Sequence, residues 1–321
     1  MVEQPTRNGQ VAGSIPARGS TFDSLIDIIG FMKLVSVGTF TKSILIEIAQ
    51  STGYLVEADI EVIEIAVPSS PTQFQMLAEA KIDLAITSPD NALAYRYLQQ
   101  NPLGRKLDVR ILGAIDRGLG LSLCYAPTLS SEPLTFGVDV PNSGFAFVGY
   151  ELLARRGVVY GSYEVVSLGS TPKRVDALID GRVNATILNA GNELRALSQS
   201  ATKVADVREI GPYIGTVFSS LGKPSTIVLT LLKVINRVID EILKGEHAQL
   251  VINAASRNLG ITKILAAEHY KTMLDPLHGL IRGGVLDSAS LQTIIDLRNK
   301  YLPTPELGEI MRDLPSLVSS K

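Results

Sequence analysis

The segment at residues 70–93, "SPTQFQMLAEAKIDLAITSPDNAL", has a counterpart at residues 171–194, "TPKRVDALIDGRVNATILNAGNEL". The two segments align without a gap at an offset of 101 residues, although few positions are identical. Each begins with a hydroxyl residue and proline, continues with an amphipathic stretch, and ends in an apolar run followed by polar residues. Proline suits the first turn of a helix, and a short apolar run suits a buried strand. The pattern therefore predicts the same helix and strand twice, in two lobes of similar architecture.

The residues around the first segment extend this pattern. Strands are predicted for "KLVSVGTF", "ADIEVIEIAV" and "IDLAITS", and helices for "TKSILIEIAQSTGY" and "PDNALAYRYLQQ". Strands that alternate with helices indicate a mostly parallel sheet covered by helices. We therefore expect an α/β protein with two similar three-layer α/β lobes, and a cleft between two lobes is the default place for a ligand.

Composition excludes several classes of protein. The chain of 321 residues carries 30 Lys and Arg against 32 Asp and Glu, which argues against a nucleic-acid partner that depends on a basic field. No apolar run approaches the roughly 20 residues of a membrane span. The single cysteine, Cys124, lies in the apolar stretch "GLGLSLCYAP" and is predicted to be a packed thiol. His247, His269 and His278 lack metal-ligand spacing, so we predict no metal site. All three lie in the last quarter of the chain, so no Ser/His or Cys/His pair can be proposed, and we predict no catalytic residues. No cofactor is predicted.

Polar residues follow the predicted strands at the points where helices begin. In a parallel sheet, ligands bind beyond the carboxyl ends of the strands, and free N–H groups at helix starts favour anions. The alternative interpretation of Ser88, Asp90 and Asn91 is a turn with a helix cap, and that of Asp116 and Arg117 is a surface ion pair. The candidate ligand-binding residues are Thr39, Phe40, Ser69, Ser70, Ser88, Asp90, Asn91, Asp116, Arg117, Asn142, Ser143, Gly144, Ser170, Thr171 and Asn189.

The quoted segments, together with "DRGLGLSL" and "FGVDVPNSGFAFVGYELLARRG", resemble type II periplasmic binding proteins over roughly residues 33–301. The resemblance is to the NMT1/THI5-like branch, which includes binding proteins of ABC importers for nitrate, sulfonates, taurine and pyrimidine precursors. It implies two lobes that are joined by two crossing strands, in "VRILGAIDRGLGLSLCYAP" and "VADVREIGPYIGTVFSS", and that close like a hinge. The expected lobes are residues 32–117 plus 222–321, which include the C-terminal helices, and residues 118–221.

Two functional classes follow from the resemblance. The first is the substrate-binding component of an ABC-type importer, a monomer that binds a small organic solute with an anionic group and is recognised by a permease. The second is a cytoplasmic enzyme or sensor on the same fold, such as a pyrimidine-precursor or menaquinone-pathway protein. Asp90 and Asp116 also suit a cationic group, so a zwitterion and a neutral heterocycle stay open as ligands.

Residues 1–31 are expected to be a disordered or spurious extension. Residues 1–21 have no periodicity, and codons for residues 11–21 can be chosen that spell a tRNA T arm and acceptor strand. We hypothesise that the start is assigned too early and that translation begins near Met32; a natural disordered tail is the alternative. This reading frame shows neither a signal peptide nor a lipid anchor, which predicts a cytoplasmic protein as encoded, although the family is usually periplasmic or lipid-anchored.

Overall fold

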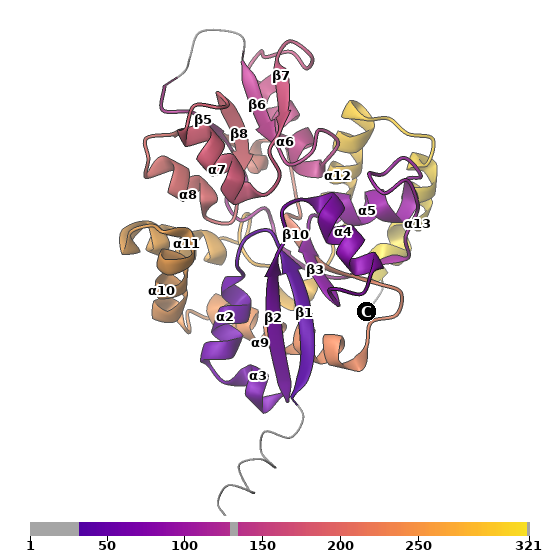
Figure 1. The fold of residues 1–321 in the computed structure, drawn as a ribbon, viewed down its shortest axis with the longest axis vertical. Coiled ribbons are helices and arrows are strands. Elements are labelled where there is room, and N and C mark those ends of the chain that lie inside the picture. Colours follow the sequence, from indigo (N-terminus) through magenta and orange to yellow (C-terminus); the bar gives the residue numbers. More distant parts are fainter. Residues whose placement is uncertain (1–31, 129–133, 320–321) are drawn as a thin grey trace, which may run out of the picture. The chain divides into compact units, whose positions relative to one another are not determined.

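The computed structural model describes residues 32–128 and 134–319, and the expectations for residues 1–31 fall outside these ranges. Figure 1 shows two α/β lobes, each built around a five-stranded sheet. The first-lobe sheet contains β1 (Lys33–Thr39), β2 (Ile60–Ala66), β3 (Leu84–Thr87), β4 (Val109–Asp116) and β10 (Thr216–Leu221). Its order is β2-β1-β3-β10-β4, in which β1 is parallel to β2 and β3, and β10 is antiparallel to both of its neighbours.

The second-lobe sheet repeats this topology. Its strands are β5 (Ser122–Tyr125), β6 (Thr135–Val138), β7 (Glu164–Ser167), β8 (Ala185–Leu188) and β9 (Thr202–Asp206). The order is β7-β6-β8-β5-β9, and again only the fourth strand is reversed. Helix α4 (Ser70–Ala78) and strand β3 begin and end 101 residues before helix α7 (Thr171–Ile179) and strand β8. The predicted architecture of two similar α/β lobes is confirmed.

Helices cover both faces of each sheet. In the first lobe, α2 (Ile44–Ser51), α3 (Tyr54–Glu57) and α9 (Thr226–Leu243) form one core, whereas α4 and α5 (Pro89–Tyr97) form another. In the second lobe, α6 (Gly144–Ala154) packs on one face of the sheet, and α7 and α8 (Asn192–Leu197) pack on the other. Cys124 is buried in this last core, where burial raises the pKa of its thiol to about 12.

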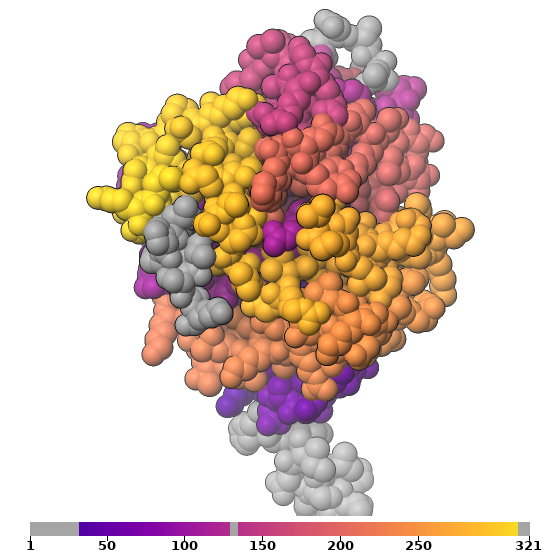
Figure 2. Space-filling view, turned by 180° about the vertical axis from the view of Figure 1, so that it is seen from behind, coloured from indigo at the N-terminus to yellow at the C-terminus, as the bar shows by residue number. Residues whose placement is uncertain are grey.

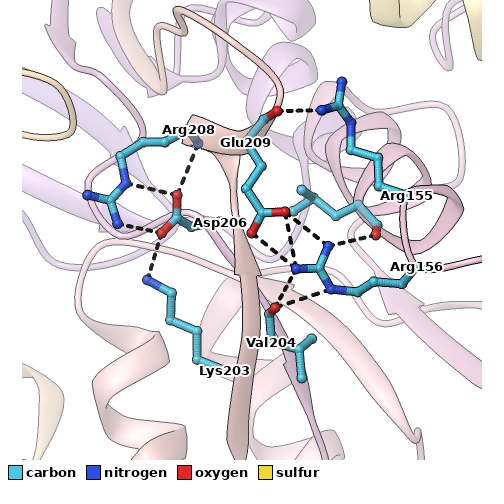
Figure 3. A network of polar contacts seen from close by, with 8 residues as sticks. Arg155, Arg156, Lys203, Val204, Asp206, Arg208 and Glu209 are labelled. Carbon is cyan, nitrogen blue, oxygen red and sulfur yellow. Dashed lines mark hydrogen bonds and ion pairs between the residues drawn. The ribbon is translucent and has the colours of Figure 1, made fainter.

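Two connections cross between the sheets. Residues 117–121 lead from β4 to β5, and residues 207–215, which include the 3-10 helix η1 (Val207–Glu209), lead from β9 to β10. Figure 3 shows how charged side chains hold the return connection. Asp206 accepts hydrogen bonds from the guanidinium of Arg208 and pairs with Lys203, and these cations keep the pKa of the Asp206 carboxyl well below its usual range. Arg156, which follows α6, donates to Glu209 and to the carbonyl of Val204.

The C-terminal helices divide between the two lobes. Helices α10 (Ala248–Leu259) and α11 (Lys263–Leu274) pack together, and α10 contacts α2 of the first lobe. The sequence predicted that α12 (Ser288–Tyr301) packs on the first lobe, but α12 contacts α6 as well as α5. In Figure 2, the yellow C-terminal residues, which include α12, lie against the magenta residues of the second lobe. The remaining elements are η2 (Arg282–Gly284) and α13 (Leu307–Ser319). Within the described residues, no helix combines the length and the hydropathy that a membrane span needs.

Candidate functional site

Two adjoining cavities lie between the lobes. The large cavity has a volume of about 110 Å³ and the small cavity about 40 Å³. Phe40, Phe145, Thr171 and Thr216 line both cavities. Phe40 follows β1 and Thr216 begins β10 in the first lobe, whereas Phe145 and Thr171 belong to the first turns of α6 and α7 in the second. Both lobes therefore contribute an aromatic ring and a hydroxyl group to the boundary between the cavities.

Three helices begin at the small cavity. Their cap residues, Ser88 before α5, Ser143 before α6 and Ser170 before α7, all line it. The side-chain oxygens of Ser88 and Ser143 accept hydrogen bonds from the N–H groups of Asn91 and Ala146, at 3.1 and 3.3 Å. The helix-cap interpretation and the cleft interpretation of these serines are therefore compatible. Helix starts carry partial positive charge, and three of them around one cavity favour a negatively charged group.

Arg174 brings a full positive charge to the small cavity. Its side chain is almost completely buried, and its N–H groups donate to the carbonyls of Ile187 and Gly169, at 3.1 and 2.6 Å, and to the hydroxyl of Thr171, at 3.0 Å. Within the described part of the chain, no carboxylate lies within ion-pair distance of it. Burial lowers the pKa of the guanidinium to about 10, so Arg174 stays charged at neutral pH. Asp139, whose Oδ1 has no hydrogen-bond partner, lines the same cavity and partly offsets this charge.

The internal repeat explains the place of Arg174. Its counterpart at the 101-residue offset is Gln73, which is also fully buried. Gln73 donates to the carbonyl of Ile86, at 3.0 Å, as Arg174 does to the carbonyl of Ile187. Sequence reasoning aligned the two positions but did not select Arg174 as a site residue. The available signal was a cation in the second lobe where the first lobe has an uncharged amide.

The large cavity is mostly apolar, with a few buried polar groups. Asp116 is only 2% exposed, and its oxygens accept hydrogen bonds from the N–H of Gly118, at 2.8 Å, and from the hydroxyl of Thr216. Burial raises the pKa of the Asp116 carboxyl to about 6, against the effect of these hydrogen bonds. His269 of α11 is buried too, which lowers its pKa to about 4 and keeps the imidazole neutral. The Nδ1 atom of His269 has no partner among the described residues.

The two lobes touch at the rim of the cavities. The N–H of Ser170 donates to the carbonyl of Pro68 at 3.0 Å, and Nδ2 of Asn192 donates to the hydroxyl of Thr41 at 3.3 Å. Pro68 and Thr41 belong to strand-to-helix connections of the first lobe, whereas in the second lobe Ser170 precedes α7 and Asn192 begins α8. The two lobes are therefore in direct contact at this rim.

The candidate residues from the sequence fall into two groups. Eight of them line a cavity: Phe40, Ser88, Asn91, Asp116, Ser143, Ser170, Thr171 and Asn189. The other seven line neither cavity: Thr39, Ser69, Ser70, Asp90, Arg117, Asn142 and Gly144. The cavity-lining residues that sequence reasoning did not select include Thr41, Asp139, Phe145, Arg174, Thr216 and His269.

Hydrogen bonds within the protein account for several residues of the second group. The hydroxyl of Thr39 donates to Glu64 at 2.7 Å. Arg117 pairs with Asp287 at 3.0 Å, so its guanidinium is engaged away from the cavities. Asp90 accepts two hydrogen bonds from Arg298, which also donates to the carbonyl of Asn142. Of these two arginines, Arg174 and not Arg117 lines a cavity between the lobes.

No family model matches the sequence, and no curated protein matches it. Solved structures, in contrast, are similar to this chain. SsuA from Xanthomonas axonopodis pv. citri, an alkanesulfonate-binding protein bound to MOPS, superposes with a TM-score of 0.66 at 16% identity, over 85% of this chain and 95% of SsuA.

Two further structures agree with this match. The Candida albicans CA3427 gene product, described as having the generic periplasmic binding protein fold, matches with a TM-score of 0.66 at 16% identity, over 89% of this chain and 95% of its own. The periplasmic nitrate-binding protein NrtA from Synechocystis PCC 6803 matches with a TM-score of 0.64 at 10% identity, over 91% of this chain and 92% of its own. The resemblance stated from the sequence is confirmed at the level of the fold: this chain has the periplasmic binding protein fold of the sulfonate- and nitrate-binding proteins.

Proposed function

We propose that the protein binds a small organic solute with an anionic group in the cleft between its lobes, as the substrate-binding component of an ABC-type importer. The observation that carries this proposal is Arg174, a buried cation without an ion-pair partner in the described residues, beside three helix starts. The similarity to SsuA and NrtA supports the same class of function. ABC-type permeases are the partners that such a component implies.

The small cavity suits one negative charge. The hydroxyls of Ser88 and Ser143 accept from backbone N–H groups, and each hydroxyl retains its own proton to donate to a bound anion. Arg174 adds charge-assisted hydrogen bonds, which are roughly twice as strong as neutral ones. The carboxylate of Asp139 opposes these groups and reduces the net positive charge. A monoanion such as a sulfonate or carboxylate therefore fits better than a dianion.

Domain closure is the proposed signal to the transporter. We propose the two lobes, residues 32–117 with 216–319 and residues 118–215, as the two bodies that move, with the protein acting as a monomer. The boundary differs from the expected residues 118–221 because β10 (Thr216–Leu221) belongs to the first-lobe sheet. A ligand that contacts Ser88 and Ser143 at once bridges these bodies, because the two serines belong to opposite lobes. Cys124 is fully buried with a raised thiol pKa, so it is unsuited to act as a nucleophile.

The test is calorimetric binding of small sulfonates, carboxylates and nitrate to the full chain and to two arginine variants. Arg174→Gln places the first lobe's residue type at the equivalent position and removes the charge. It should weaken anion binding roughly ten- to a hundredfold, because a hydrogen bond to a charged group is worth roughly 1.5–3 kcal/mol. Arg117→Ala is the control and should bind as the unmodified protein does. Equal binding by the Arg174→Gln variant would refute the proposal, and turnover of the bound compound would assign the protein to the enzyme class.

A further inference from the structure

Asp116 differs from the other buried carboxyl groups of the described chain. Asp90, Glu151 and Asp206 each lie within ion-pair distance of an arginine or lysine. Asp116 and Glu193 have no such partner among the described residues. Glu193 packs against Gly120 and lines neither cavity, whereas Asp116 lines the large cavity.

The Asp116 carboxylate retains unused capacity to accept hydrogen bonds. The carboxylate accepts hydrogen bonds from the N–H of Gly118 and from both the hydroxyl and the backbone N–H of Thr216. Two carboxylate oxygens have four lone pairs between them, so the group can accept once more. A buried carboxylate without a cation is costly, and a partner with N–H groups offsets that cost. In the large cavity, the one Lys or Arg among the described lining residues is Lys42, whose amine pairs with Glu47 at 3.2 Å.

Asp116 lies close to the boundary between the large and the small cavity. Thr216 donates to Asp116 and lines both cavities, and Phe40 and Phe145 lie at the same boundary. The large cavity, at about 110 Å³, is close in size to the engineered apolar cavity of about 150 Å³ that binds benzene. Most of its wall is apolar, with side chains that include Ile44, Leu45, Ile86, Ile115, Leu119 and Met273.

We infer, on the basis of the proposed function, that the solute has two polar ends: an anionic group held by Arg174, and an ammonium or similar N–H donor held by Asp116. An apolar part of about the size of one ring connects them between Phe40 and Phe145. Asp116 then selects for the donor group, and Arg174 for the anion.

Three probes separate the two ends. Para-(aminomethyl)benzenesulfonate carries both groups, benzenesulfonate carries only the anion, and benzylamine carries only the cation. Their affinities are measured by calorimetry at about pH 7.5 for the full chain, for Asp116→Asn and for Arg174→Gln. The unmodified protein should bind the two-ended probe most tightly. Asp116→Asn should weaken that probe roughly ten- to a hundredfold and leave benzenesulfonate unchanged.

The outcomes distinguish this inference from the proposed function. If Asp116→Asn does not change the ratio of affinities for the two sulfonates, or if the two-ended probe binds no better than benzenesulfonate, the inference is wrong while anion binding stands. If Arg174→Gln has no effect on either sulfonate but Asp116→Asn weakens benzylamine, the anion site is wrong while the donor site stands.

A measurement on the unmodified protein guards against misfolding of the Asp116→Asn variant. Protonation of Asp116 below its pKa of about 6 should weaken the two-ended probe at about pH 5 and spare benzenesulfonate. The titratable groups near this carboxylate or lining the large cavity include His269, Tyr213 and Lys42. The pKa of His269 is near 4, and the pKa of Tyr213 is raised well above its usual value, so neither of these changes charge in this range. Lys42 and its partner Glu47 are the charged pair at the cavity rim. Equal pH dependence for both sulfonates would overturn the assignment of Asp116.

Discussion

Asp90 of α5 and Arg298 of α12 form a buried, two-pronged ion pair. Nε and Nη2 of Arg298 donate to the two carboxylate oxygens of Asp90, each at 2.7 Å, and the side chains are 1% and 3% exposed. Nη2 of Arg298 also donates to the carbonyl of Asn142 in the second lobe, at 3.3 Å. A strand-to-helix turn of each lobe thus meets a C-terminal helix at one pair of charges. Lys300 and Tyr301 extend this junction, because both donate to Glu151 of α6.

Breaking this ion pair should destabilise the protein strongly. Asp90→Ala or Arg298→Ala leaves one buried charge without a partner, which costs roughly 3–5 kcal/mol of the free energy of unfolding. Chemical denaturation measures this change. Asp180→Ala removes the partner of Arg182 in a solvent-exposed pair at 3.4 Å and should cost less than about 1 kcal/mol. Similar costs for the two pairs would contradict the structural role of Asp90.

Gly144 supplies the space for the Asp90 side chain. A Cβ atom at Gly144 would lie 2.4 Å from Cβ of Asp90, which is closer than packed carbon atoms approach. Gly144→Ala should therefore destabilise the fold by roughly 1–3 kcal/mol, as overpacked cores do. Gly308→Ala is the control, because a Cβ at that helical position meets nothing within 4 Å. Thermal unfolding should show a lower midpoint for Gly144→Ala and an unchanged or higher midpoint for Gly308→Ala.

Glu193 should make stability depend on pH. Burial raises the pKa of its carboxyl from 4.5 to about 8, so the folded protein retains a proton that the unfolded chain has already lost. The contribution of Glu193 is fully present below about pH 4.5 and is lost as pH approaches 8. Above about pH 6.5, where Asp116, His269 and His278 no longer change charge, Glu193 should make stability fall by roughly 1 kcal/mol per pH unit. Glu193→Gln keeps the shape without the titration and should remove this slope in denaturation curves between about pH 6.5 and 8. Glu268→Gln, on an exposed helix surface, should retain it.

The parts of the fold that sequence predicts are those set by local pattern. The proline-started helices α4 and α7 and the apolar strands β3 and β8 follow from side chains within a few residues, and the offset between them was visible in the chain. Ser88 and Ser143 were found in the same way, because capping and cleft lining require the same residue type at the same turn. Local pattern therefore predicts the turns that surround the site.

Long-range pairing is what the sequence did not reveal. Asp90 pairs with Arg298, which lies 208 residues away in the sequence, and Arg117 pairs with Asp287, which lies 170 residues away. No local sequence pattern indicates these partners. The amphipathic pattern of α7 also does not show that Arg174 points inward, since a cation on such a helix normally faces solvent. The pairing of Asp90 and Arg117 and the inward orientation of Arg174 determine which charged side chains line the cavities. These features are visible only in the tertiary structure.

Gly169 offers a test of cleft closure. Its φ is +78°, and a Cβ atom there would lie 2.5 Å from the carbonyl oxygen of Pro68 in the opposite lobe. Gly157 has a nearly equal φ of +80° with nothing within 4 Å, so alanine there carries the same backbone strain without the clash.

Both alanine variants should therefore lose similar stability, of about 1 kcal/mol. Only Gly169→Ala should weaken binding of benzenesulfonate, because its methyl group obstructs the contact between Ser170 and Pro68 that closes the rim. Small-angle scattering should show compaction on addition of benzenesulfonate for the unmodified protein and for Gly157→Ala, and less compaction for Gly169→Ala. If Gly169→Ala binds and compacts as Gly157→Ala does, the contact at Pro68 plays no part in closure, and the ligand is enclosed by other means.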